Sequence, residues 1–268
     1  MRRGRIFWAL MLLLAGTLLL LNNFDVIQVD VWSLFWPSFL ILLGVWILWG
    51  SLSKTPPRES EKATIPLEGA SEARVQIKHG AGRLQVSGGA DPADLLSGVF
   101  GWGLEKDVRR RGERIDVVMR PAHGIFPDVI FPWTWASGHG LDWEIALNEE
   151  LPLDLTFETG AGEASLDLST VQVKNLRLQT GASSTRVNLP DNAGHTTMKV
   201  EAGVASVSIR VPDGVAGKIQ SVSGLSSISV DQNRFPKKNG AFISDDYQTA
   251  QNTVEIRIET GVGSVKVT

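Results

Sequence analysis

The chain has 268 residues, of which 43% are hydrophobic and 21% are charged, and its formal net charge is −3. This length and composition allow a sizeable core together with a membrane segment. The slightly negative net charge argues against nonspecific binding of nucleic acid, so no nucleic-acid partner is expected. Because the chain contains no cysteine, disulfides and thiolate metal sites are excluded.

Residues 1–52 are predicted to form a hairpin of two transmembrane helices, about 6–24 and 31–52, which anchors the chain in a lipid bilayer. The first apolar run contains no charge and follows a cluster of three arginines. A secretory signal peptide is the alternative for this run, but no small-x-small cleavage site follows Leu21. The second run is also uncharged, and tryptophans flank both of its ends, as is typical of residues at a membrane interface.

Charges around the hairpin predict its orientation. Arginines precede the first helix, and Lys54, Arg58 and Lys62 follow the second, whereas the connecting turn 25–30 has neither Lys nor Arg. By the positive-inside rule, both ends of the hairpin lie in the cytoplasm. We therefore expect a bacterial inner (cytoplasmic) membrane protein whose remaining residues lie on the cytoplasmic side.

A polar linker and a large β-domain follow. The linker covers 53–64 and is centred on two prolines, which favour an extended tether. From residue 65 to 268 the pattern predicts a β-domain, with a less regular first part, 65–150, and regular coils over 151–268. In the first part, 91–100 is compatible with either a helical turn or a loop.

The irregular part carries most of the candidate interaction residues. Arg109, Arg110 and Arg111 precede a glycine and a predicted strand, which indicates a charged hairpin that could face anionic lipid headgroups. The glycines before them fit neither a Walker A loop nor a dinucleotide fingerprint, so no cofactor is expected. Trp133 and Trp135 could bind a sugar, a peptide or the bilayer surface, or they could cap the first coil of the repeat.

The regular part is a repeat in which apolar residues alternate on both sides of a glycine, a pattern that predicts strand, bend and strand. Its glycines are Gly80, Gly160, Gly181, Gly203, Gly224 and Gly261. Successive glycines from Gly160 to Gly224 are 21, 22 and 21 residues apart. This spacing predicts a mainly β fold, a β-solenoid-like domain with coils of about 21 residues.

The bend has two expected consequences. Each glycine either adopts a positive φ or lets its backbone approach the next coil closely. The residues that follow the glycines, namely Ala161, Ala182, Val204 and Leu225, are predicted to form one inward-facing column, because a coil cannot bury its apolar face without its neighbours.

An excursion over 231–252 interrupts the repeat before its last copy. It contains Phe235, the last of the candidate interaction residues. An uncovered terminal coil would offer its edge for self-association or for strand addition by a partner. The excursion is a candidate for blocking that edge.

No constellation for catalysis is recognisable. The histidines do not lie at metal-ligand spacings, and the serines lack both a partnered base and a Gly-x-Ser-x-Gly elbow. The acidic residues of the repeat alternate with apolar ones, as on the solvent face of strands. A carboxylate pair contributed by neighbouring coils, as solenoid carbohydrate enzymes use, remains the alternative. We therefore expect no enzyme and no catalytic, cofactor or metal site.

Four stretches together resemble a known family. The run Val31–Trp46 is similar to the membrane segment of LiaI/LiaF-like bacterial envelope proteins. Ser97–Gly101, Trp143–Asn148 and Leu153–Leu168 resemble the toast-rack β-repeat domain that often follows that segment. The resemblance implies a toast-rack fold and a role in sensing or modulating cell-wall and membrane stress beside a two-component system. It implies no catalytic residue.

The sequence therefore predicts a non-enzymatic, membrane-anchored scaffold or regulator. Its β-domain would modulate a cell-envelope stress response through protein–protein contacts, with a sensor kinase or another membrane protein as partner. One alternative is a structural β-solenoid that self-assembles. The other is a carbohydrate-binding or carbohydrate-active solenoid that faces outward.

Overall fold

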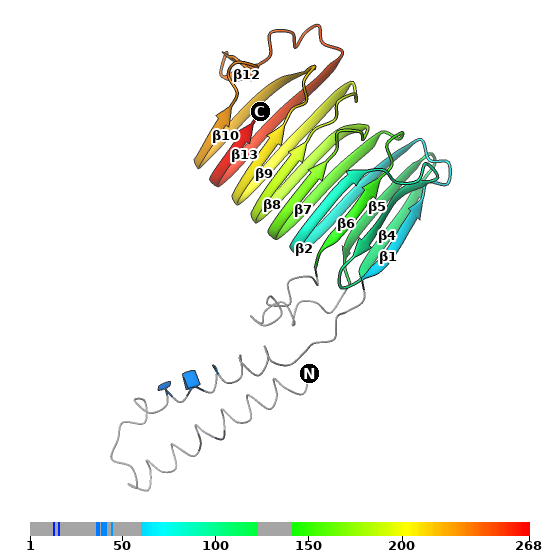
Figure 1. Ribbon diagram of the computed structural model, residues 1–268, viewed down its shortest axis with the longest axis vertical. Coiled ribbons are helices and arrows are strands. Elements are labelled where there is room, and N and C mark those ends of the chain that lie inside the picture. Colours follow the sequence, from blue (N-terminus) through cyan, green and yellow to red (C-terminus); the bar gives the residue numbers. More distant parts are fainter. Residues whose placement is uncertain are drawn as a thin grey trace. The chain divides into compact units, whose positions relative to one another are not determined.

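The computed structural model describes residues 60–122 and 141–268, together with residues 13, 16, 36, 37, 39–41 and 44. The two long ranges consist mostly of β-strands, thirteen of which are hydrogen-bonded into one sheet (Figure 1). The prediction of a mainly β fold is confirmed. The strands are β1 (Glu61–Pro66), β2 (Glu72–Gly88), β3 (Asp94–Phe100), β4 (Leu104–Arg111), β5 (Arg114–Pro121), β6 (Trp143–Leu147), β7 (Leu153–Asp167), β8 (Val173–Asn188), β9 (His195–Arg210), β10 (Val215–Val230), β11 (Lys237–Lys238), β12 (Ala241–Ile243) and β13 (Asn252–Val267).

Most of the predicted membrane hairpin, with helices at 6–24 and 31–52, lies outside the described residues. The few positions described there are helical, and within the described part of the chain no helix is long and apolar enough to span a bilayer. The predicted linker ends earlier than expected, because β1 begins at Glu61.

Six long strands, each carrying one copy of the repeat, lie side by side and parallel in the order β2, β7, β8, β9, β13, β10 (Figure 1). Equivalent positions of the copies are paired, so that Leu155 lies between Val75 and Leu176. The copy on β2 is remote in sequence but forms the first coil of this stack. Strands β3, β4, β5 and β6 come between these first two coils in the sequence.

The last copy in the sequence is not the last coil in space. β13 inserts between β9 and β10 and pairs with both over nearly its whole length. The excursion at 231–251 makes this order possible. It connects the end of β10, the last coil in space, to the start of β13, which lies one coil further inside the stack. β10 is therefore the terminal coil.

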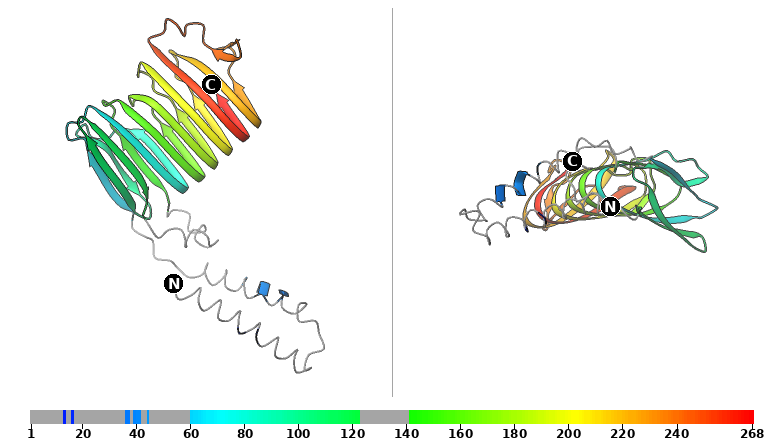
Figure 2. Two further views of the ribbon diagram at one scale, coloured as in Figure 1. Left: turned by 180° about the vertical axis from the view of Figure 1, so that it is seen from behind. Right: turned by 90° about the horizontal axis from the view of Figure 1, so that it is seen from below.

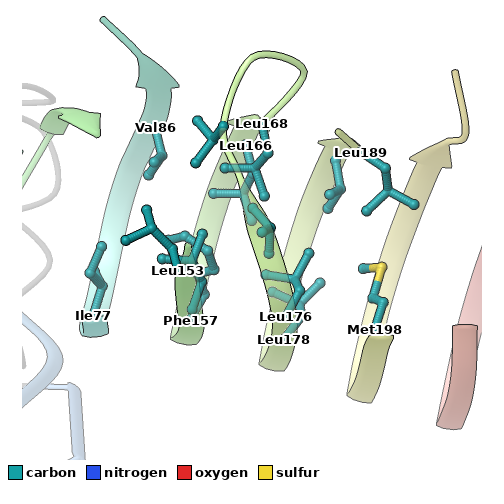
Figure 3. Packing of buried hydrophobic residues seen from close by; sticks show 14 of the residues in the cluster. Ile77, Val86, Leu153, Phe157, Leu166, Leu168, Leu176, Leu178, Leu189 and Met198 are labelled. Atoms are coloured by element: carbon teal, nitrogen blue, oxygen red, sulfur yellow. The ribbon is translucent and has the colours of Figure 1, made fainter. Parts of the chain in front are cut away.

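Alternate residues from both halves of each long strand are buried in one core. The long strands curve around the space that holds this core (Figure 2). Residues at equivalent positions of neighbouring coils form columns in this core. The column three residues before the repeat glycines contains Ile77, Phe157, Leu178, Val200 and Ile258, all with 0% of their surface exposed. Figure 3 shows how such side chains from neighbouring coils fill the space between the strands. Because burial of one large apolar side chain contributes about 1.5–3 kcal/mol, columns of this kind hold the stack together.

Gly160 and Gly181, two of the repeat glycines, are required by close approach between coils. A Cβ on Gly160 would lie 2.2 Å from the carbonyl oxygen of Gly80, and one on Gly181 would lie 2.7 Å from that of Gly160. The positive φ expected at the bend occurs two residues later, at Gly162, where it is 135°. In the coil of β7 the bend thus uses glycine twice, at Gly160 for space and at Gly162 for conformation.

The predicted inward column does not exist. Ala161, Ala182 and Val204 are exposed, and the side chain of Leu225 is not among those described. In β9, both Ala202 and Ala205 are buried, although they are three residues apart. The alternation breaks there because the chain turns a convex corner, which leaves two consecutive residues outside. An apolar residue at the corner is therefore a surface residue.

Additional strands cover the first coil. β5 pairs with Glu72–Ile77 and β6 pairs with Leu84–Gly88, so each half of β2 has its own neighbour. β3 and β1 continue the sheet from β6, and β4 continues it from β5. Residues 94–100, where a helical turn or a loop was expected, form strand β3. The start of the stack is therefore closed by paired strands.

Candidate interaction surface

Arg109, Arg110 and Arg111 lie on β4, in the antiparallel β4–β5 hairpin that the sequence predicts. Arg109 Nη2 lies 2.7 Å from Asp107 Oδ2. Arg110 donates hydrogen bonds to the carbonyl oxygens of Leu67 and Glu68, at 3.1 and 2.8 Å. Arg111 is exposed beside the hairpin turn. Arg110 thus holds the hairpin against the turn before β2, whereas the partner of Arg109 lies on β4 itself.

Phe235 is a core residue, and its prediction as an interaction residue is wrong. Its side chain is 0% exposed, and a Cβ on Gly217 of β10 would come within 2.7 Å of its ring. The guanidinium of Arg234 lies 5.0 Å from the ring centroid. The excursion therefore uses Phe235 to attach itself to the first half of the terminal coil.

Trp133 and Trp135 lie outside the described residues, and the chain is described again from Leu141. There, Nε2 of the buried His79 lies 2.7 Å from the carbonyl oxygen of Leu141, and its ring packs 5.4 Å from that of Trp143. Burial lowers the pKa of His79, and the Leu141 carbonyl and Asp142 oppose this shift only in part. His79 thus anchors the return of the chain at the corner of β2.

We expect the stability of the β-domain to fall as the pH drops below about 6.5, the ordinary pKa of histidine. Because the folded-state pKa of His79 is lowered, the unfolded chain binds more protons than the folded one from pH 6.5 down to that lowered value. Denaturant unfolding of wild type and His79→Gln at pH 7.5 and 5.5 measures this effect. The variant should lose less stability between the two pH values, and an equal loss would contradict the role of His79.

A charged face covers the outer side of the first strand halves. Glu201 receives hydrogen bonds from Lys199, Gln179 and Arg177, and Lys199 and Gln179 contribute most to a pKa lowered to about 2. Lys199 also lies 3.2 Å from Glu259 on the next coil. Since exposed pairs each contribute at most about 1 kcal/mol, this network stabilises the stack mainly through the number of its contacts.

A shallow hollow of about 570 Å³ lies on this face, across β2, β7, β8 and β9. Its charged side chains are all in ion pairs: Arg74 with Asp154 at 3.2 Å inside the hollow, and the others with charged residues beside it. A ligand would have to displace these pairs. In the part of the chain that the structure describes, no three His, Cys, Asp or Glu side chains gather closely enough to hold a metal ion.

The terminal coil has an open edge. β12 pairs with the outer side of β10 at Lys218 and Ile219, whereas no described strand pairs with that side from Gln220 to Val230. The predicted blocking by the excursion therefore applies to only one half of the coil. Residues 220–230 contain no charge and no proline, the features with which proteins commonly protect an exposed strand edge. We call this stretch the open edge.

Exposed valines lie on the open edge and on the two coils next to it. Val204, Val222 and Val262 are 64%, 72% and 47% exposed, and they lie on the last three coils of the stack. We call them the valine group. Val262 pairs directly with Val204 on one side and with Leu225 on the other. Exposed apolar residues gathered in this way are typical of a surface that binds another protein.

The terminal coil also departs from its neighbours in two columns. Val222 occupies the outward column that holds Lys78, Glu158, Gln179, Glu201 and Glu259 in the other coils. Ser221 occupies the core column of Phe157 and Ile258, and it is exposed. The sequence prediction did not include this site. Alignment of the copies by their glycines nevertheless shows that Ser221 replaces an apolar residue and that Val222 replaces a polar or charged one.

A family model described as the N-terminal domain of toast_rack, DUF2154, matches residues 54–210 of the chain. A second model, for the LiaI-LiaF-like transmembrane region, matches residues 6–48. A comparison with curated proteins gives no match.

Two solved structures match the chain, and one of them is similar in fold. One is a protein from Clostridium sporogenes ATCC 15579 that is suggested to act in cell adhesion, with 21% identity and a TM-score of 0.66, covering 78% of this chain and 98% of that one. The other is a suggested adhesin from Bacteroides fragilis NCTC 9343, with 8% identity and a TM-score of 0.28, covering 79% of this chain and 99% of that one, and it carries no argument. The first likeness shows the fold alone. Because the toast_rack model covers more than half of the chain and is preceded by the matching membrane region, the chain belongs to the toast_rack family, in an arrangement similar to that of LiaI-LiaF-like proteins.

Proposed function

We propose that this chain is a membrane-anchored, non-enzymatic scaffold or regulator that acts in a cell-envelope stress response by binding another protein. The observation that carries the proposal is the open edge beside the valine group. An unprotected strand edge supplies backbone hydrogen bonds, and the valines supply apolar area, which together are what strand addition requires. The family membership supports the connection to the envelope.

The proposed location is the bacterial inner membrane, with the β-domain on the cytoplasmic side. Support comes from the match to the LiaI-LiaF-like transmembrane region at residues 6–48 and from the distribution of Lys and Arg around the apolar runs. A partner reached from this side is a cytoplasmic or an inner-membrane protein, such as a sensor kinase.

Photo-crosslinking in living cells tests this function. With a photoreactive amino acid in place of Val262, we expect an adduct with a different protein, at a yield at least fivefold above that from the same amino acid at Lys174. Lys174 is exposed, and it lies outside the valine group, so it is the matched control. The captured protein should be cytoplasmic or embedded in the inner membrane.

Val204→Glu, which places a charge beside the probe, should abolish the adduct without changing the amount of protein, because burying an unpaired carboxylate in an interface is costly. Equal yields from Val262 and Lys174 would overturn the proposed function. Capture of proteins located outside the membrane would overturn the proposed side.

A further inference from the structure

Three cations on the outer face of the second strand halves have no acidic partner. Arg186 on β8, Arg210 on β9 and Lys266 on β13 are exposed, and none of them forms an ion pair within the part of the chain that the structure describes. The outward positions in the second halves of β8, β9, β13 and β10 contain no acidic residue. The repeat itself does not impose this, because the second half of β7 carries Glu163, which lies 3.9 Å from Arg83.

The first halves of the same four coils are arranged differently. There, acidic residues stand on coils next to the cations, so that Arg177 pairs with Glu201 at 2.8 Å and Lys218 pairs with Glu255 at 3.3 Å. The second halves thus keep their positive charge uncompensated. Such a face attracts an acidic group of another molecule.

Three rows of side chains with different chemistry run across the last coils. The apolar row contains Val204 and Val262, two members of the valine group that pair with each other. Two residues further along each strand lies the serine row, whose exposed members are Ser184, Ser206, Ser264 and Ser227, paired in this order. Two residues further again lies the cation row, with Arg186 and Lys266 on either side of Ser208. Neighbouring rows are roughly 7 Å apart.

An α-helix lying across the coils fits these rows. Neighbouring strands are about 4.8 Å apart, close to the 5.4 Å rise of one helical turn, so each coil meets about one turn. Arg186 and Lys266 are two coils apart, which is roughly 10 Å and close to the separation of helix residues i and i+7. The serine side chains between the outer rows are short, which lets a helix come close to the sheet.

An extended strand laid across the coils fits the rows less well. Its side chains alternate between two opposite sides, so it cannot bring apolar and acidic side chains next to each other onto one contact. A helix does this with adjacent stripes on its surface. The rows therefore favour an amphipathic helix that has an acidic stripe beside an apolar one.

A protein suits this face better than a nucleic acid or a lipid surface. The three rows contain no aromatic residue on which a base could stack. The predicted membrane segment joins the β-domain at β1, which begins the sheet, whereas the rows lie on the last four coils. Lipid headgroups are therefore the less suitable source of negative charge.

We propose that the three rows bind an amphipathic helix of another protein, lying across β8, β9, β13 and β10. Its apolar stripe would cover Val204 and Val262, and two acidic residues seven positions apart would pair with Arg186 and Lys266. The inference rests on the proposed function and deepens it by naming the kind of segment that the partner presents. The helix leaves the open edge accessible to a strand of the same partner.

A synthetic helix tests the fit with the full-length chain in nanodiscs of phosphatidylcholine. The probe is a fluorescent peptide of about 18 residues, with leucines along one stripe and glutamates seven positions apart along the next. Fluorescence anisotropy, corrected with empty nanodiscs, should give a Kd below about 0.1 mM. The same peptide with lysines in place of the glutamates should bind at least tenfold more weakly. Equal binding of the two peptides would overturn the inference.

Two double variants separate the cation row from a general effect of charge. Arg186→Gln with Lys266→Gln should weaken binding of the acidic peptide about tenfold. The matched control is Arg177→Gln with Arg257→Gln, which removes two exposed cations from the first halves of the same coils, β8 and β13, and should weaken binding less than twofold. Circular dichroism should show that both variants are folded. Equal weakening by the two variants would contradict the proposed helix site.

Variation of the apolar row and a lipid competitor complete the test. Val204→Ser should weaken binding of the acidic peptide about fivefold, because the leucine stripe loses its contact. Vesicles of phosphatidylcholine with about 30% phosphatidylserine should leave the peptide bound. If these vesicles displaced half of the peptide or more, the face would be a lipid-binding surface and the helix would be the wrong occupant.

The outcomes separate this inference from the proposed function. If the acidic peptide does not bind but the probe at Val262 captures a different protein in cells, the proposed function stands and the helix is wrong. If the peptide binds as expected and the probe at Val262 gives no more adduct than Lys174, the helix site is right and the proposed regulatory contact is wrong.

Discussion

Gly160→Ala should destabilise the β-domain by about 3 kcal/mol, near the upper end of the usual cost of overpacking. The new Cβ would lie 2.2 Å from the carbonyl oxygen of Gly80, which is backbone and cannot rotate away as a side chain can. Relief of the clash requires the first two coils to separate, which weakens the hydrogen bonds between β2 and β7 on both sides of the bend. Thermal unfolding followed by circular dichroism should show a Tm lower by roughly 6–12 °C.

Gly80→Ala is the matched control. Gly80 has the same place in its own copy, and neither glycine has a positive φ, but a Cβ on Gly80 would meet no atom within 4 Å. We expect a change of about 0.5 kcal/mol or less. If both variants lost the same stability, the glycines would be needed for backbone freedom at the bend, and the close approach between coils would not be their reason.

Local pattern was sufficient to predict the interior of the stack. Leu155, Phe157 and Leu166 alternate with polar residues, and all three are buried as predicted. Period-two alternation is a property of neighbouring residues, so it is visible without any knowledge of the fold. The spacing of the glycines likewise revealed that the copies stack, because identical units present identical edges to each other.

The order of the coils could not be predicted in the same way. The copies on β10 and β13 have similar patterns, and nothing local tells which of them lies next to β9. Their exchange depends on the path of residues 231–251, a long-range property. The exposure of Ala161 and Val204 was missed for a related reason, since a convex corner interrupts the alternation that the prediction extended through it.

The open edge falls between these cases. Its signal was present in the sequence, because Ser221 and Val222 are exceptions in two otherwise consistent columns. The meaning of the exceptions required the structure, which places this coil at the end of the stack and shows where β12 stops covering it. A residue that departs from its column indicates a terminal coil only when the order of the coils in space is known.

Phe235→Ala should destabilise the β-domain by about 3–5 kcal/mol, the usual cost of truncating a fully buried aromatic side chain. The ring is 0% exposed and packs against Gly217, where no other side chain could enter without a clash. Its loss leaves a cavity beneath the excursion, so β12 should detach from Lys218 and Ile219. Denaturant unfolding measures the first effect, and hydrogen exchange at the Ile219 backbone measures the second.

Comparison of Phe235→Ala with two control variants tests whether Phe235 is a core residue or a binding residue. Lys238→Ala, an exposed change in the same excursion, should alter the free energy of unfolding by about 0.5 kcal/mol or less. Phe235→Leu, which leaves a smaller cavity, should fall between the two. If Phe235→Ala kept full stability, the ring would not be part of the core and the assignment of β10 as a half-covered terminal coil would fail. If stability is lost as expected, detachment of β12 should leave the first half of the β10 edge open as well as the second.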